Sequence, residues 1–195
     1  MSADHESKRD ARASADYSYE AFGREFFEQS VTRERVENAL SNLAGNAIDF
    51  GPRKAGPAGL ASISATGEVG APRVERVPGK RVRFAVTIPI RLQLVVRLAG
   101  HDHRFDGELG AHLTLTAMAR APLKIFIDVP APTEKDVDVD VEAQGLRASV
   151  LDVVADVDGE LRRFVARHIG REIEKPKIRD MREIDVAARL HKDRG

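Results

Sequence analysis

The stretch VRFAVTIPIRLQLVVRL, residues 82–98, determines how the rest of the chain must fold. Every second position in it is apolar, and these positions are Val82, Phe84, Val86, Ile88, Ile90, Leu92, Leu94, Val96 and Leu98. A period of two over such a length predicts a β-strand with one apolar face and one mostly polar face. If unbroken, the strand would span about 55 Å at ~3.3 Å per residue. The chain must therefore supply something equally long to cover the apolar face.

A second long alternation follows a turn that we expect at Ala99–Arg104. Its inward positions are Phe105, Gly107, Leu109, Ala111, Leu113, Leu115 and Ala117. The two stretches together predict one long antiparallel hairpin. Pro89 lies on the polar face of the first stretch, where a missing backbone donor predicts an edge position, a bulge or a bend. Shorter alternations predict strands over 60–69, 123–129 and 137–143, a brief extension at 146–150, and a closing strand over 184–190.

Three segments have the spacing of amphipathic helices. Tyr19, Phe22 and Phe26 share a face of a short helix, which either docks on the core or serves as a lid or partner-binding helix. Thr32 is the expected N-cap of a second helix, which ends before a Gly- and Pro-rich loop predicted over 51–59. The apolar stripe of this second helix is expected to include Val36, Leu40, Leu43 and Ala47. The longest helix is predicted from Leu151 to Glu174, with Pro176 ending it.

Composition limits what kind of protein this is. The chain has 195 residues with 31 basic and 31 acidic side chains, so no net charge favours nucleic acid or an anionic membrane. It has no cysteine, which excludes disulfides and thiolate metal sites. Residues 1–16 are polar and predict a disordered tail without the apolar segment of a secretory signal, and residues 17–195 predict a single domain. We expect no transmembrane segment and a cytoplasmic location.

Candidate catalytic and metal-binding residues are few. His101, Asp102 and His103 have H-x-H spacing, but His112 falls several residues along the next strand, so we expect a solvated turn rather than a metal site. The acids at 136, 138, 140 and 142 alternate with valines, which predicts a solvated strand face rather than a calcium loop. No G-x-S-x-G elbow, P-loop or G-x-G-x-x-G is present. We therefore expect no catalytic residue, no metal and no cofactor.

The order of these elements predicts an α+β fold in which a long twisted antiparallel sheet wraps on a long C-terminal helix, with an N-terminal helix. This pattern resembles the tubular lipid-binding (TULIP) superfamily, which includes the synaptotagmin-like mitochondrial lipid-binding (SMP) domains. The resemblance covers roughly residues 30–190. It is carried by the helix TRERVENALSNLAG, the long strand at 82–98 with its partner, and the late helix LDVVADVDGELRRFVARHIGREI. It implies a hydrophobic groove that binds acyl chains without catalysis.

The function expected from this pattern is binding of a lipid or another long apolar ligand in an aliphatic groove or tunnel. The side chains expected to line it are Phe84, Val86, Ile88, Ile90, Leu92, Leu94, Leu113, Leu115, Leu161, Phe164, Val165 and His168. His168 is otherwise interpreted as a partly exposed core histidine. In the alternative, the helices fill the whole apolar face, and the protein is an interaction or scaffold module that forms a homodimer. An enzyme is the least supported class, because no nucleophile or acid–base pair can be placed.

Overall fold

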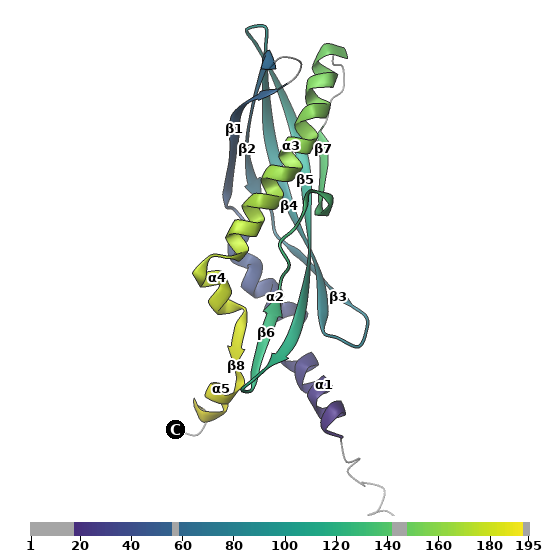
Figure 1. Ribbon diagram of the computed structural model, residues 1–195, viewed down its shortest axis with the longest axis vertical. Coiled ribbons are helices and arrows are strands. Elements are labelled where there is room, and N and C mark those ends of the chain that lie inside the picture. Colours follow the sequence, from purple (N-terminus) through teal and green to yellow (C-terminus); the bar gives the residue numbers. More distant parts are fainter. Residues whose placement is uncertain (1–17, 56–58, 142–147, 193–195) are drawn as a thin grey trace, which may run out of the picture.

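The computed structural model describes residues 18–55, 59–141 and 148–192, with only the backbone described for 148–156 and 190–192. The tail predicted over 1–16 lies outside the described residues. A strongly curled antiparallel sheet forms an elongated half-barrel, with one helix along its hollow side and further helices at one end (Figure 1). The α+β fold predicted from the sequence is therefore confirmed.

Two long strands form the centre of the sheet, β4 (Arg83–Leu98) and β5 (His101–Arg120). They pair without interruption from Arg83 opposite Thr116 to Leu98 opposite His101, which confirms the predicted hairpin. The turn is shorter than the expected Ala99–Arg104. Only Ala99 and Gly100 connect the strands, with φ angles of 51° and 80°. Two positive φ angles in a two-residue connection match the right-handed twist of the flanking strands, so the turn needs no further residues.

Each long strand has two shorter partners that lie end to end along it. Strand β4 pairs with β2 (Ala61–Val69) and then β3 (Arg73–Val77), while β5 pairs with β7 (Val137–Val141) and then β6 (Lys124–Asp128). The remaining strands are β1 (Ala47–Ala55) beside β2 and β8 (Glu183–Asp185) beside β6. Among the strands that the structure describes, β4 and β5 are the two that run through both halves of the half-barrel.

Pro89 lies at the junction of these halves rather than at a sheet edge. Its position falls between the residues of β4 that pair with β3 and those that pair with β2. The carbonyl of Pro89 accepts a hydrogen bond of 2.7 Å from the N–H of Gly70. Gly70 lies in the short connection between β2 and β3. A strand residue directs its N–H and C=O to the same side, so the missing donor of Pro89 falls in this gap and the β4–β5 ladder is preserved.

The predicted second helix is partly correct. Thr32 is the N-cap of α2 (Arg33–Leu40), which is followed by a single 3₁₀ turn, η2 (Ser41–Leu43). Ala47 is not helical, and the loop expected over 51–59 is wrong for residues 51–55, because β1 continues to Ala55, while residues 56–58 lie outside the described residues. The register of β1 shifts between Phe50 and Arg53, around Gly51–Pro52. A Gly–Pro pair can therefore mark a bulge in an edge strand as well as a loop.

The C-terminal elements also differ from the expectation. The long helix α3 (Ala148–Ile173) is confirmed, but it begins early enough that the strand extension expected at Ala148 and Val150 is wrong. Residues 142–147, including the rest of that extension, lie outside the described residues. The short helix α4 (Pro176–Met181) has proline at its first position, where the missing donor costs nothing. The closing strand is limited to β8, because α5 (Val186–Lys192) follows, and Asp185 accepts a hydrogen bond of 2.8 Å from the Ala188 N–H at its start.

The predicted N-terminal helix is confirmed as α1 (Tyr19–Ser30), and the Ser18 hydroxyl accepts a hydrogen bond from the Ala21 N–H at its start. No residue of α1 is buried. Tyr19 is 98% exposed and Phe22 61% exposed, while Phe26 and Phe27 pack partly against the core. The helix extends from the end of the half-barrel where β3, β6 and β8 lie (Figure 1). It is thus docked by one end only.

Candidate ligand-binding site

The concave face of the sheet is the strongest candidate for a binding site. Ten of the twelve residues expected to line a ligand are at most 8% exposed and belong to one cluster: Phe84, Val86, Ile88, Ile90, Leu92, Leu94, Leu113, Leu115, Leu161 and Val165. Gln93 on the opposite face of β4 is exposed, so the alternation predicted for this strand has the correct register. The structure thus brings strand and helix residues together on one apolar interior.

The other two predicted residues lie at the side of this interior. The Phe164 ring packs edge-on against Phe50 of β1 at 5.0 Å, and the His168 ring stacks on Phe164 at 5.9 Å. Both side chains are half-buried. His168 is therefore with Phe164 on the side of α3 that meets β1, because the predicted stripe of α3 is wide enough to reach the sheet edge.

Helix α3 bridges the two edges of the upper half of the half-barrel, over β1 on one side and β7 on the other (Figure 1). At the β7 side, Arg162 Nη1 donates a hydrogen bond of 3.0 Å to the carbonyl oxygen of Val137. Asp158 accepts two hydrogen bonds of 3.1 Å from the same guanidinium, and this contact raises the pKa of Arg162 further above its usual value. The helix thereby covers the aliphatic interior that the curled sheet leaves open.

The interior is chemically uniform. No polar or charged side chain is buried among the residues whose side chains are described. In one row across the sheet, Leu92 lies between Gly67 of β2 and Gly107 of β5. Aliphatic walls without a polar group can hold a hydrocarbon chain by burial alone, but they supply no group for acid–base or nucleophilic chemistry.

The histidines considered for metal binding lie on different faces of the sheet. His101 and His103 follow the alternation of Phe105 on β5, whereas His112 has the opposite parity and lies on the convex face. Asp102 accepts two hydrogen bonds from Arg97, which lower the pKa of this carboxyl. Within the described ranges, no three His, Cys, Asp or Glu side chains are close enough to hold a metal ion.

The contacts of His112 could not be found from the sequence. Its Nε2 is 2.8 Å from Asp138 Oδ2, and its Nδ1 is 3.2 Å from Thr87 Oγ1. These residues are far apart in the chain and come together only because β4, β5 and β7 are adjacent.

Asp138 is 77% exposed and Asp140 is also exposed, so these two acids of β7 line a solvated surface, as predicted. The prediction is wrong for Asp136, which is half-buried in the 3₁₀ turn before β7 and accepts hydrogen bonds from the N–H and hydroxyl of Thr133. Glu142 lies outside the described residues.

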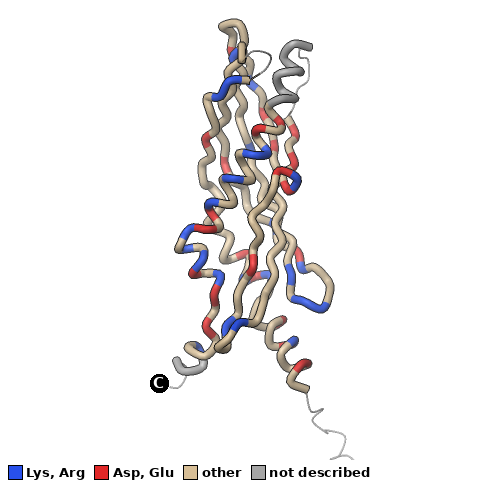
Figure 2. Tube along the Cα trace, in the orientation of Figure 1, with Lys and Arg blue, Asp and Glu red and all other residues tan. Residues whose placement is uncertain are grey.

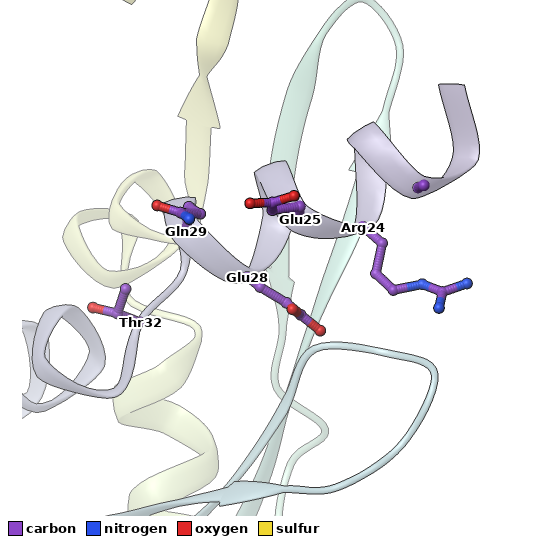
Figure 3. A pocket seen from close by; sticks show the side chains of 6 residues that line it. Arg24, Glu25, Glu28, Gln29 and Thr32 are labelled. Atoms are coloured by element: carbon purple, nitrogen blue, oxygen red, sulfur yellow. The ribbon is translucent and has the colours of Figure 1, made fainter. Parts of the chain in front are cut away.

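Two open grooves lie along the flanks of α1, and neither is lined by any of the twelve predicted residues. The first, of about 530 Å³, is lined by Ala21, Arg24, Glu25, Glu28, Gln29 and Thr32 (Figure 3). The second, of about 470 Å³, separates α1 from the loop residues just before β4 and the last residues of β5. Neither groove could be predicted from the sequence, because no periodicity indicates where α1 docks.

No protein-family model matches this chain, and no curated protein matches it. The resemblance to tubular lipid-binding proteins therefore stays a prediction that rests on the order and length of the elements. Among the helices that the structure describes, none combines the length and the apolar character needed to span a membrane.

Proposed function

We propose that the protein binds a lipid or another long apolar ligand between the concave face of the sheet and α3, without catalysing a reaction. The observation that supports this is the length of the apolar surface. Strand β4 presents seven buried apolar side chains on one face, Phe84, Val86, Ile88, Ile90, Leu92, Leu94 and Val96. An acyl chain is the common biological ligand that is both long and uniformly apolar.

Three further features support the same proposal. The interior is aliphatic and carries no buried polar side chain among those described. Helix α3 lies over both edges of the half-barrel and so encloses the apolar interior. A ligand would lie in this interior beside the core side chains. The twelve residues expected to contact the ligand lie on β4, β5 and α3, which together surround this layer.

The direct test is to examine the purified protein for bound ligand. We expect native mass spectrometry and solvent extraction to find a co-purified lipid, and a fluorescent fatty acid to bind with a saturable signal. Protein that carries no ligand after gentle purification and takes up no fatty acid would contradict the proposal. The uncharged methyl ester of the same fatty acid serves as a second probe, since the proposal requires only the apolar chain.

A paired substitution on β4 tests whether the interior is a binding layer or a filled core. If Leu92 is tightly packed, Leu92→Ala should lower the free energy of unfolding by about 2–5 kcal/mol without affecting ligand uptake. If it lines a ligand, the loss should be nearer ~1–2 kcal/mol and fatty-acid binding should change. Urea unfolding and fatty-acid titration of the same variant measure both quantities.

Gln93→Ala is the matched control for Leu92→Ala, because this exposed neighbour points to the convex face. It should change the free energy of unfolding by less than about 0.5 kcal/mol and leave binding unaltered. A larger effect at Gln93 than at Leu92 would mean that the assignment of inward and outward faces on β4 is wrong.

The alternative function, an interaction module that forms a homodimer, has one specific observation in its favour. Tyr19 and Phe22 expose apolar rings on a helix that buries no residue, and unpaired apolar faces of this kind often meet a partner. Light scattering across a range of protein concentrations distinguishes the cases. A mass that stays monomeric throughout would remove the homodimer, and a dimer that dissociates in Phe22→Ser would support it.

A further inference from the structure

The second groove, at the end of the half-barrel near α1, combines an apolar floor with a charged rim. Its walls come from α1, the loop between β3 and β4, and the last residues of β5. The lining residues are Glu20, Gly23, Arg24, Phe27, Lys80, Arg81, Val82, Ala117, Met118 and Ala119. Three cations and one carboxylate are among them, whereas the six residues of the first groove include two carboxylates and one cation. The two flanks of α1 therefore differ in the sign of their charge.

The cations of this groove are available to a ligand. Lys80 and Arg81 are exposed, and neither forms an ion pair with any residue that the structure describes. Arg24 is already paired with Glu20 at 3.3 Å on the same helix. Lys and Arg appear in blue along the β3–β4 loop (Figure 2). An anion in the groove would thus meet two cations whose charge is not already neutralised by a protein carboxylate.

The loop that carries Lys80 and Arg81 is held in place by hydrogen bonds from a side chain of β3. Arg76 of β3 donates hydrogen bonds of 3.0, 3.2 and 3.1 Å to the carbonyl oxygens of Val77, Arg81 and Arg83. Its guanidinium lies 5.5 Å from the centre of the Phe84 ring, a residue of the concave face. Because one side chain bonds to the backbone at both ends of the loop, the loop backbone that carries the two cations does not have to become ordered when a ligand binds.

The floor of the groove lies next to the concave face along the two long strands. Val82 and Ala117 are buried, and the Ala117 N–H donates a hydrogen bond of 2.9 Å to the Val82 carbonyl. Next to them on the inward face of their strands are Phe84 and Leu115, which are opposite each other and belong to the predicted lining. Phe27 of α1 forms the facing wall, and α1 buries no residue. An apolar chain could therefore pass this helix with little loss of buried surface.

We infer that this groove is the mouth of the lipid site and holds the anionic headgroup, a carboxylate or a phosphate, of a single-chain amphiphile, with Lys80 and Arg81 binding the headgroup. The hydrocarbon chain passes between Phe27 and Val82 and lies along the concave face toward Ile88 and Ile90. This inference rests on the proposed function, since it assigns the headgroup end of the same site. It goes further in naming the charge of the ligand and the direction in which it lies.

The headgroup assignment is tested with the double variant Lys80→Gln, Arg81→Gln and two probes, a fluorescent long-chain carboxylate and the corresponding alcohol. The affinity for the carboxylate should fall about three- to tenfold, as expected for losing two exposed charge contacts, and the affinity for the alcohol should not change. Arg91→Gln, Arg104→Gln is the matched control. It makes the same change of net charge at exposed residues of β4 and β5, and should leave both affinities unaltered.

The possible outcomes separate this inference from the proposed function. Wild-type protein that binds neither probe contradicts the proposed function itself. Wild-type protein that binds both probes, with the Lys80, Arg81 variant retaining full affinity for the carboxylate, overturns only the headgroup assignment. In the wild-type protein, competition against the fluorescent carboxylate distinguishes the headgroup source. Displacement by lysophosphatidic acid but not by oleic acid indicates a phosphate, and displacement by oleic acid but not by lysophosphatidic acid indicates a carboxylate.

The direction of the ligand is tested by tryptophan quenching, which is possible because the chain has no natural Trp. One reporter is Phe27→Trp in the groove, and the other is Phe105→Trp near the opposite end of the hairpin, where Phe105 pairs with Leu94. Stearic acid with a nitroxide beside its carboxylate should quench the Phe27→Trp reporter more than the Phe105→Trp reporter. Stronger quenching of the Phe105→Trp reporter by that probe would overturn the inferred direction.

Discussion

Leu92 lies in a row of the sheet where its neighbours on both sides are glycines, Gly67 and Gly107. A Cβ on Gly67 would be 2.6 Å from Leu92 Cδ2 and closer still to the carbonyl oxygen of Arg91. A Cβ on Gly107 would be 3.3 Å from Val141 Cγ2. The absent side chain of Gly67 gives the Leu92 side chain the space that it occupies on the concave face, whereas the absent side chain of Gly107 leaves room for Asp140 and Val141 of β7. Glycines in a strand interior are normally unfavourable, so close approach is the reason for them here.

Gly67→Ala should lower the free energy of unfolding by about 1–3 kcal/mol, because the added methyl group meets backbone as well as the Leu92 side chain. Urea unfolding measures the change. Gly23→Ala in α1 is the control, since nothing lies within 4 Å of its Cβ position. It should leave stability unchanged or raise it by up to about 1 kcal/mol through helix propensity. Equal losses at both glycines would show that crowding on the concave face is not the cause.

At the scale of elements, α3 is attached to the sheet by different forces at its two sides. At the β1 side the contact is the aromatic pair Phe50 and Phe164. At the β7 side a half-buried guanidinium, Arg162, bonds to a strand carbonyl and to Asp158 of its own helix. Apolar burial sets how closely the helix approaches, while the directional hydrogen bond to Val137 fixes its position along β7.

Arg162→Ala should lower the free energy of unfolding by about 1–3 kcal/mol, because the Val137 carbonyl loses a charged donor. The adjacent Arg163 is the matched control. It pairs with Glu160 on the exposed side of the helix, so Arg163→Ala should cost less than about 0.5 kcal/mol. Chemical denaturation of both variants at one pH measures the difference, and equal losses would mean that the bond to β7 does not hold the helix.

At the scale of the whole molecule, stability is not evenly distributed. The central hairpin of β4 and β5 is covered on its concave face and paired on both sides over most of its length. Helix α1 buries no residue and extends from one end (Figure 1). Segments with little buried surface open without unfolding of the rest, whereas central strands exchange their amide hydrogens only when the whole domain unfolds.

Hydrogen exchange measured by mass spectrometry should therefore show rapid exchange over residues 19–30 and slow exchange over residues 84–96. A fatty acid bound as inferred above should slow exchange in α1, since Phe27 would gain an apolar neighbour. Protection of α1 as strong as that of β4 in the ligand-free protein would contradict this view of the molecule.

The sequence alone determined the elements whose signal is local. The alternation at 82–98 and its partner predicts the hairpin, the stripe of the late helix predicts α3, and Thr32 predicts the start of α2. In each, side chains a few residues apart must share a face if the apolar ones are to be buried, so the period can be read without knowing the fold. The inward register of β4, and with it most of the candidate lining, follows from the same local rule.

Tertiary structure alone decided the features that depend on distant partners. Gly51–Pro52 is a bulge because β1 pairs with β2, and Pro89 is tolerated because β2 and β3 leave a gap there. Residues 186–192 form a helix although their first positions alternate, since the pairing of β8 with β6 ends at Asp185, opposite the first residue of β6. The groove with Lys80 and Arg81 exists only because α1 docks beside a loop that is distant in the chain. Such pairings depend on long-range contacts and on the curl of the sheet, which no local period encodes.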